Sequence, residues 1–291
     1  MGNLKYPPSR REALAALLAA GVAHAGASLD AFMDGERGCA LLVDIPGRRL
    51  IAAHRLEVAA AELNPPGSTV KPLVLAALLG AGKLGPEEAF PCPGRLTIAG
   101  EPFPCSHPPV PTPIVPRTAL AYSCNCYVAH FAQRFAPGEL ARYLERSGIA
   151  SPAGWLGGGA ASAAGSIQPA AAGAPSQLQA LGERRVAVTV AGLAMAYRSL
   201  AMGAAPVILE GLEDAVEYGT AQRAAVPRLQ IAGKTGSLRT ESGKLVAWFA
   251  GFAPSRAPRV VVAVMLQARS GGGDAAPVAG RILAAWQAGR L

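Results

Sequence analysis

Ser68 and Lys71 are the first residues whose types and spacing are suited to chemistry. They lie in the segment NPPGSTVKP, residues 64–72, where a Pro/Gly break predicts that a helix begins at Ser68. Residues three apart share one face of a helix, so we expect the lysine amine to reach the serine hydroxyl. A serine becomes a nucleophile when a nearby base takes its proton, and burial lowers the pKa of a lysine enough to make it that base. By itself the pattern is also typical of a serine that caps a helix.

The second motif is Ser123-Cys124-Asn125, which interrupts an apolar segment of helical spacing at residues 118–135. The hydroxyl of Ser123 is suited to relay a proton to a leaving amine, and the amide of Asn125 is suited to hold a substrate amide. By itself the motif is equally consistent with a polar break between two helices.

The third motif is Lys234-Thr235-Gly236-Ser237, in a β-prone segment. A lysine and a hydroxyl at a strand edge are suited to hold a substrate carboxylate, and a glycine lets an extended substrate lie close to the strand. The backbone N–H groups of Ser237 and Ser68 are expected to form an oxyanion hole. By itself the motif also fits a solvated strand end.

Strand-like segments lie towards both ends of the chain, with helical segments between them. Residues 38–54 predict a hairpin, and residues 228–238, 244–253 and 259–267 predict three more strands. Helices are predicted at residues 68–79, 118–135, 186–202, 207–224 and 275–287, with a surface loop at 154–175. This order indicates an α+β fold: an antiparallel sheet formed by the N- and C-terminal strands, flanked by helices, with an inserted and mostly helical lobe.

In this order and context, the three motifs resemble the signature set of penicillin-binding proteins and class A β-lactamases. The segments at residues 64–72, 121–127 and 247–252 are similar to those of penicillin-binding transpeptidases, and the resemblance extends over about residues 38–287. Cys124 stands where the signature set has an aspartate, at a position that varies in the family.

The resemblance implies a serine acyltransferase that acts on the D-Ala-D-Ala end of peptidoglycan stem peptides through an acyl-enzyme, as a D,D-transpeptidase or D,D-carboxypeptidase. Ser68 is then the nucleophile, Lys71 takes its proton, and Ser123 relays a proton to the departing D-alanine. β-Lactams are expected as covalent inhibitors, and no cofactor or metal is expected. The substrate-binding residues that the resemblance implies are Asn125, Lys234, Thr235 and Gly236.

Two other functions stay open at this point: a serine β-lactamase, and a non-catalytic sensor module that binds β-lactams or peptidoglycan. Class A lactamases need a glutamate in an E-x-x-L-N-like loop, which the segment after Glu139 does not match. Class D enzymes resemble S-x-V at the second motif, where this chain has Asn125. The presence of every motif residue argues against a non-catalytic module.

The first 25 residues predict an export signal. A polar lead containing Arg10-Arg11 precedes an apolar run at residues 13–23 and an A-x-A pattern that ends at Ala25. The run is shorter than the roughly 20 residues that span a bilayer. We therefore expect a signal peptide at residues 1–25, of the twin-arginine type, although an ordinary amphipathic helix is the alternative. The remaining residues, 26–291, would form a periplasmic or otherwise extracytoplasmic catalytic domain without a pedestal domain or stable membrane span.

Composition excludes some classes of protein. Hydrophobic residues make up 51% of the chain and charged residues 16%, which is unlike a disordered chain. The net charge is +8, but Lys and Arg are scattered and form no basic stripe, so we expect no nucleic-acid partner.

Export permits disulfides. Cys92 and Cys105 flank a predicted hairpin, and a disulfide between them is our first expectation. A zinc site that adds His107 is the alternative, but no fourth ligand is evident from the sequence. Cys124 and Cys126 are two residues apart, so on a helix their side chains would not face each other, and we expect them to be small buried residues.

Overall fold

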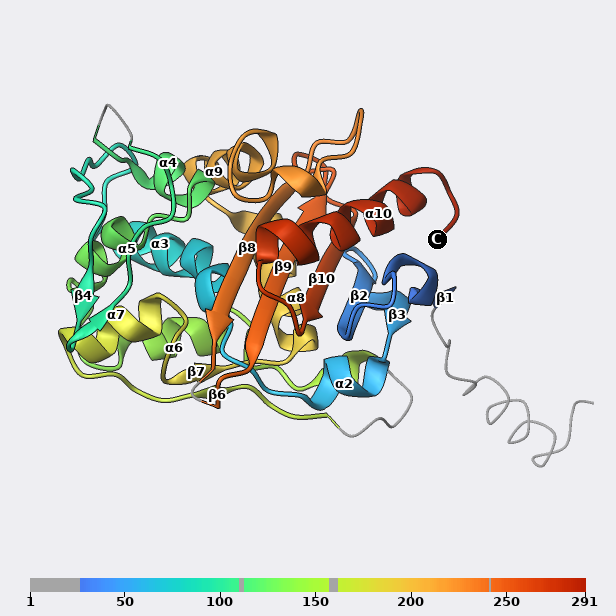
Figure 1. Ribbon diagram of the computed structural model, residues 1–291, viewed down its shortest axis with the longest axis horizontal. Coiled ribbons are helices and arrows are strands. Elements are labelled where there is room, and N and C mark those ends of the chain that lie inside the picture. Colours follow the sequence, from blue (N-terminus) through green and yellow to red (C-terminus); the bar gives the residue numbers. More distant parts are fainter. Residues whose placement is uncertain (1–26, 110–112, 157–161, 241) are drawn as a thin grey trace, which may run out of the picture.

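A six-stranded sheet forms the centre of the protein in the computed structural model, which describes residues 27–109, 113–156, 162–240 and 242–291 (Figure 1). The strand order is β1-β3-β2-β10-β9-β8, and all neighbours are antiparallel except β1 and β3. This sheet joins N- and C-terminal strands, which confirms the α+β prediction. The strands are β1 (Ala27–Ser28), β2 (Gly38–Asp44), β3 (Arg49–His54), β8 (Ala232–Arg239), β9 (Leu245–Ala253) and β10 (Val260–Leu266).

Both faces of the sheet are covered by helices. Strand β10 reads VVVAVML and is buried throughout, because Val261 and Met265 face one hydrophobic core while Val262 and Val264 face another. Helix α8 (Val190–Gly203) covers the first face and α10 (Ala276–Gln287) the second (Figure 1). The sheet is thus packed between two hydrophobic cores, and β8 is its end strand.

The helical lobe lies beside β8 (Figure 1). Two small antiparallel ribbons, β4 with β5 and β6 with β7, accompany it. None of the helices within the described residues is long and apolar enough to cross a membrane. The elements outside the main sheet are α2 (Leu56–Ala61), α3 (Lys71–Gly80), β4 (Thr97–Ile98), β5 (Glu101–Pro102), α4 (Pro116–Ala121), α5 (Asn125–Ala132), α6 (Glu139–Arg146), β6 (Ser166–Ile167), α7 (Ala174–Ala180), β7 (Val186–Ala187) and α9 (Pro206–Glu217).

Several element boundaries differ from the sequence predictions. The predicted helix at 118–135 is two helices, because Ser123 takes a left-handed backbone with φ of 57° between α4 and α5. Helix α9 ends at Glu217 rather than at 224, and α6 was not predicted. Residues 1–25, where we predicted the signal peptide, lie outside the described residues.

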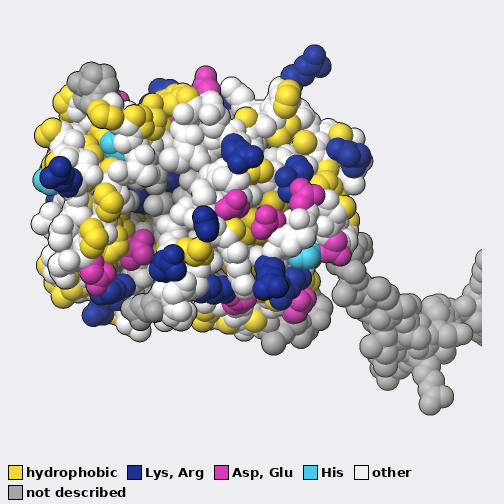
Figure 2. Space-filling model, in the orientation of Figure 1, with side chains coloured by type: hydrophobic (Ala, Val, Ile, Leu, Met, Phe, Trp, Pro, Cys, Tyr) yellow, Lys and Arg dark blue, Asp and Glu magenta, His cyan; other side chains and the backbone are white. Residues whose placement is uncertain are grey.

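Lys and Arg side chains are scattered over the face shown in Figure 2, with Asp and Glu side chains among them. Arg256 pairs with Glu213, and Arg134 pairs with Glu88. In these pairs an acidic neighbour compensates the positive charge locally.

Candidate active site

Ser68 lies in a tight turn that ends directly at the helix carrying Lys71. Residues Gly67–Val70 form a 3-10 turn, and α3 begins at Lys71, so the predicted helix start at Ser68 is wrong by one turn. Gly67 has φ of 52°, which favours glycine, and its N–H donates to the carbonyl of Gly182 at 3.0 Å. The turn holds Ser68 half-buried at the wall of a cavity.

Lys71 is fully buried and connects the first two motifs. Its Nζ donates to the carbonyl oxygen of Ser123 at 2.7 Å, to Asn125 Oδ1 at 2.5 Å, and to Ser123 Oγ at 3.2 Å. Burial lowers the pKa of Lys71 to about 8, against an opposing effect of nearby cysteine sulfurs and Glu183. Only the neutral amine can accept a proton, so the lowered pKa increases the fraction of Lys71 that can act as a base.

Ser123 and Asn125 are held by their backbone and by the β4–β5 hairpin. The positive φ of Ser123 is unusual for a residue with a side chain, and such strain is common at functional sites. Cys124 is the N-cap residue of α5, and its Sγ accepts a hydrogen bond from the N–H of Tyr127. The amide of Asn125 donates to the carbonyl of Pro104 at 3.0 Å. Its oxygen is thereby turned towards Lys71.

The third motif lies on the open edge of the sheet. Lys234 is fully buried, its Nζ donates to the carbonyl of Thr235 at 3.0 Å, and burial together with the charge of Lys71 lowers its pKa well below the usual value. Thr235 Oγ1 donates to Thr220 Oγ1 at 2.9 Å. Thr235 and Ser237 line the cavity wall, whereas Lys234 lies beneath it.

Gly236 lets β8 pass directly against the nucleophile turn. A Cβ at this position would lie 2.9 Å from the carbonyl oxygen of Pro66 and 3.2 Å from Thr69 Cγ2. A Cβ on Gly67 would in turn lie 3.8 Å from the backbone nitrogen of Ser237. The contact therefore brings Ser237 next to the turn that carries the nucleophile.

The three motifs meet at one cavity of about 540 Å³. Sequence reasoning missed part of its wall. Thr220 and Arg223 lie after α9 in the chain, and Ser270, Gly272 and Gly273 lie before α10. Arg223 donates to the carbonyl of Gly273 at 2.9 Å. No motif marks these positions, and only their place beside β8 reveals them. The motif residues on the cavity wall are Ser68, Ser123, Asn125, Thr235 and Ser237.

Two further cavities flank this region. One of about 890 Å³ lies along the distal half of β8 and is lined by Glu183, Leu238 and Arg239, among others. Burial raises the pKa of Glu183, while the charge of Lys71 lowers it.

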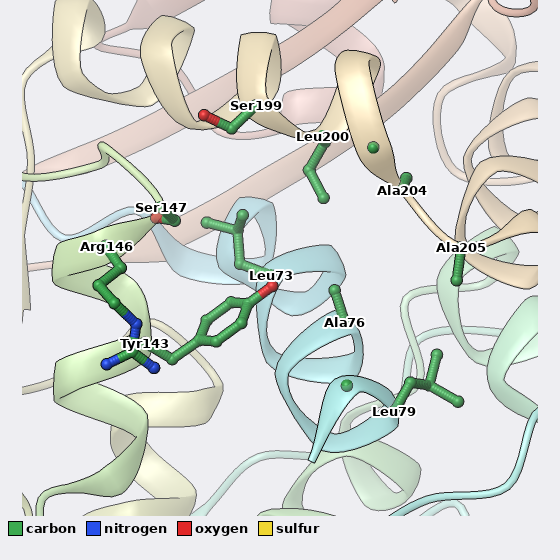
Figure 3. A pocket seen from close by; sticks show the side chains of 12 residues that line it. Leu73, Ala76, Leu79, Tyr143, Arg146, Ser147, Ser199, Leu200, Ala204 and Ala205 are labelled. Atoms are coloured by element: carbon green, nitrogen blue, oxygen red, sulfur yellow. The ribbon is translucent and has the colours of Figure 1, made fainter. Parts of the chain in front are cut away.

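The second of these cavities, of about 510 Å³, lies between α3, α6 and α8 (Figure 3). It is lined mainly by apolar side chains and by Tyr143, and none of the motif residues borders it, so it is not the reactive site.

The cysteines differ from our first expectation. The β4–β5 hairpin is present, but Cys92 and Cys105 are free thiols with their Sγ atoms 3.6 Å apart, so the expected disulfide is absent from this part of the described chain. The two sulfurs face Cys124 and His107 as well as each other. Cys124 and Cys126 are buried, as predicted.

Three motifs that converge on one cavity, between a helical lobe and the open edge of an antiparallel sheet, define the penicillin-recognising class of fold. A family model described as the penicillin binding protein transpeptidase domain matches residues 53–208 and 202–284. The chain therefore belongs to the penicillin-binding protein transpeptidase family.

Individual relatives agree with this assignment. The chain is 27% identical over 277 residues to the peptidoglycan D,D-transpeptidase PbpA of Mycobacterium tuberculosis strain H37Rv, in an alignment covering 78% of this chain and 56% of the relative. PbpA of strain CDC 1551 gives the same values. The chain thus spans a little over half the length of the curated relatives that it matches.

Solved structures share the fold. The apo transpeptidase domain of Burkholderia pseudomallei penicillin-binding protein 3 gives a TM-score of 0.78 at 20% identity, covering 90% of this chain and 92% of that one. Pseudomonas aeruginosa PBP2, in complex with WCK 5153, gives 0.77 at 21% identity, covering 89% of this chain and 75% of that one. At these identities the likeness concerns the fold alone.

Proposed function

We propose that the protein is a penicillin-binding serine acyltransferase that acts on the D-Ala-D-Ala end of peptidoglycan stem peptides. The observation that carries this proposal is the environment of Lys71. Its buried amine lies one turn after Ser68 and donates to Ser123 Oγ and Asn125 Oδ1. A buried amine with a lowered pKa, one turn after Ser68 and hydrogen-bonded to Ser123, supports the proposal of a base that serves both the nucleophile and the proton relay.

In the proposed acylation step, neutral Lys71 takes the proton of the Ser68 hydroxyl. The Ser68 oxygen forms a bond to the carbonyl carbon of the penultimate D-alanine, and the resulting oxyanion accepts hydrogen bonds from the N–H groups of Ser68 and Ser237. As the oxyanion collapses, the peptide C–N bond breaks. The proton held by Lys71 passes through Ser123 Oγ, 3.2 Å away, to the departing amine of D-alanine.

The open edge of β8 is suited to hold an extended peptide as an additional strand. In this position the amide of Asn125 would contact the peptide backbone, and Thr235 would hold the terminal carboxylate. Lys234, directly beneath, contributes positive charge whenever it is protonated. Arg223 adds a cation on the same wall of the cavity.

An amine or a water molecule then attacks the acyl-enzyme carbonyl and releases Ser68. With an amine acceptor the protein is a D,D-transpeptidase, and with water it is a D,D-carboxypeptidase. Hydrolysis is the second candidate reaction because of Glu183, a half-buried carboxyl group that lines the cavity along β8 and interacts with the charge of Lys71. In its ionised form such a group is suited to activate water.

Mass spectrometry of the products from a synthetic stem peptide, with and without an added amine, tests the proposal. We expect release of D-alanine, with a cross-linked product when the amine is present. A protein that releases no D-alanine under either condition would contradict the assignment. Nitrocefin distinguishes a β-lactamase, which sustains hydrolysis, from a penicillin-binding protein, which gives one stoichiometric burst.

A further inference from the structure

A cluster of thiols and an imidazole lies beside the active site and is not used in the proposed reaction. The Sγ atom of Cys92 lies 3.6 Å from that of Cys105 and 3.5 Å from that of Cys124. Cys105 Sγ lies 3.7 Å from Cys124 Sγ, and His107 Nε2 lies 3.6 Å from Cys92 Sγ. The four ligand atoms lie within 4.8 Å of one another.

These four separations match edges of a metal-centred tetrahedron, and all six pairs of ligand atoms lie within 4.8 Å. With Zn–S bonds of about 2.3 Å and Zn–N bonds of about 2.0 Å, tetrahedral geometry puts two sulfurs roughly 3.8 Å apart and a sulfur and a nitrogen roughly 3.5 Å apart. A disulfide instead needs its two sulfurs about 2.05 Å apart, and all the cysteines in the cluster are free. Three thiolates and one imidazole in a tetrahedron form a donor set that selects Zn²⁺.

Backbone groups around the cluster orient the ligands as they do around thiolate-bound metals. Each of the three sulfurs accepts one backbone N–H: Cys92 from Gly94 at 3.3 Å, Cys105 from Cys126 at 3.5 Å, and Cys124 from Tyr127 at 3.4 Å. A thiolate gains more from such hydrogen bonds than a neutral thiol does.

The imidazole is oriented in the same way. His107 Nδ1 lies 2.8 Å from the carbonyl oxygen of Pro108. A carbonyl oxygen can only accept a hydrogen bond, so Nδ1 carries the proton and donates it. The lone pair is then on Nε2, the nitrogen that faces Cys92 Sγ. A cavity of about 190 Å³ borders Cys92 and His107 and offers an ion a route to the cluster.

Cys126 is the remaining sulfur in this region, and its contacts exclude it from the ligand set. Its Sγ lies 3.5 Å from Cys105 Sγ and donates to the carbonyl of Arg95 at 3.5 Å. A thiol that donates a hydrogen bond keeps its proton, whereas a zinc ligand has lost it.

We propose that Cys92, Cys105, His107 and Cys124 bind one Zn²⁺ ion. Four protein ligands leave no open position, so the ion is structural. It would join the hairpin segment that carries three of the ligands to the start of α5. Asn125 follows Cys124 directly and already donates to Pro104 in that segment, so the ion holds the second motif against the hairpin.

Metal binding by the wild-type protein is the first test. We expect protein purified without reductant or chelator to contain one Zn²⁺ per chain by elemental analysis. After chelation under reducing conditions, one equivalent of Co²⁺ should give the intense visible bands of a tetrahedral site and a thiolate charge-transfer band, and Zn²⁺ should remove both. Reduced protein that binds neither ion stoichiometrically, or metal-free protein whose non-reducing peptide map links Cys92 to Cys105, would overturn the proposal.

Variants assign the ligands. Cys92→Ser and His107→Ala should weaken Zn²⁺ binding by at least roughly 100-fold in competition with a chromophoric chelator. Cys126→Ser and Cys39→Ala are matched controls that should retain one-to-one binding. Loss of binding in Cys126→Ser together with unchanged binding in His107→Ala would refute the assignment. These measurements do not require turnover, so their outcome is independent of the proposed acyltransferase activity.

Discussion

Lys71 offers the sharpest test of the proposed chemistry, because its pKa predicts how the rate depends on pH. With a pKa of about 8, about 9% of Lys71 is neutral at pH 7, whereas an ordinary lysine with a pKa of 10.5 would be about 0.03% neutral. Burial therefore raises the fraction that can act as a base by about 300-fold. Because the neutral amine is the base, acylation should accelerate about tenfold per pH unit below pH 8 and level off above it.

Several other charged or titratable groups act on Lys71 and belong to the same titration. Three cysteines and Glu183 lie near the amine, and a negative charge on any of them would raise the pKa of Lys71. The Lys71 and Lys234 charges disfavour each other, which adds to the effect of burial on Lys234. The groups are Cys105, Cys124, Cys126, Glu183 and Lys234.

The assay is the second-order rate constant for acylation by a fluorescent penicillin, measured between about pH 5.5 and 9.5 within the range in which Lys71 titrates. Lys71→Ala should slow acylation by on the order of 10²–10⁴, the usual contribution of a general base, and should remove the rise with pH. Lys83→Ala is the matched control, because Lys83 pairs with Glu139 on the surface of the helical lobe. A flat wild-type profile, or a Lys71→Ala rate close to that of the wild type, would refute the role of Lys71 as base.

Three further changes test separate parts of the reasoning. Ser68→Ala should abolish the penicillin adduct in peptide mass mapping while leaving the circular dichroism spectrum unchanged, and an adduct that persists would remove Ser68 as nucleophile. Gly236→Ala should lower the free energy of unfolding by roughly 1–3 kcal/mol in chemical denaturation, because the new methyl group would lie 2.9 Å from the carbonyl oxygen of Pro66. An unchanged free energy of unfolding would show that the nucleophile turn can shift to make room for the methyl group. N-terminal sequencing of exported protein should start at Gly26, and a mature chain that still begins at Met1 would contradict the predicted signal cleavage.

The three motifs that the structure brings together could be recognised in the sequence because the spacing within each motif is local. Ser68 and Lys71 are three residues apart, and Lys234 to Ser237 are contiguous, so each group is visible before any fold is known. The strands were predicted for a similar reason: a run such as VVVAVML in β10 is buried on both faces and stays apolar throughout. Such local patterns depend little on tertiary contacts.

Features that depend on tertiary contacts could not be predicted in this way. Ser68 was placed at a helix start, but the close approach of Gly67 to Gly182 winds that segment into a tighter turn. Helix α7 begins at Ala174, inside a Gly- and Ala-rich stretch that predicted a loop, because packing against α5 outweighs weak local propensity. Arg223 reaches the cavity wall only because α9 ends beside β8.

Cys124 belongs to both the catalytic motif and the thiol cluster, and this explains why the sequence did not reveal the fourth zinc ligand. Cys92, Cys105 and His107 lie within one hairpin segment, whereas Cys124 is 17 residues beyond His107 at the start of α5, a separation that matches no common zinc pattern. At the middle of S-x-N, a side chain points away from the cavity while its neighbours, Ser123 and Asn125, point into it. A metal ligand at this position therefore holds both neighbours without entering the reactive site.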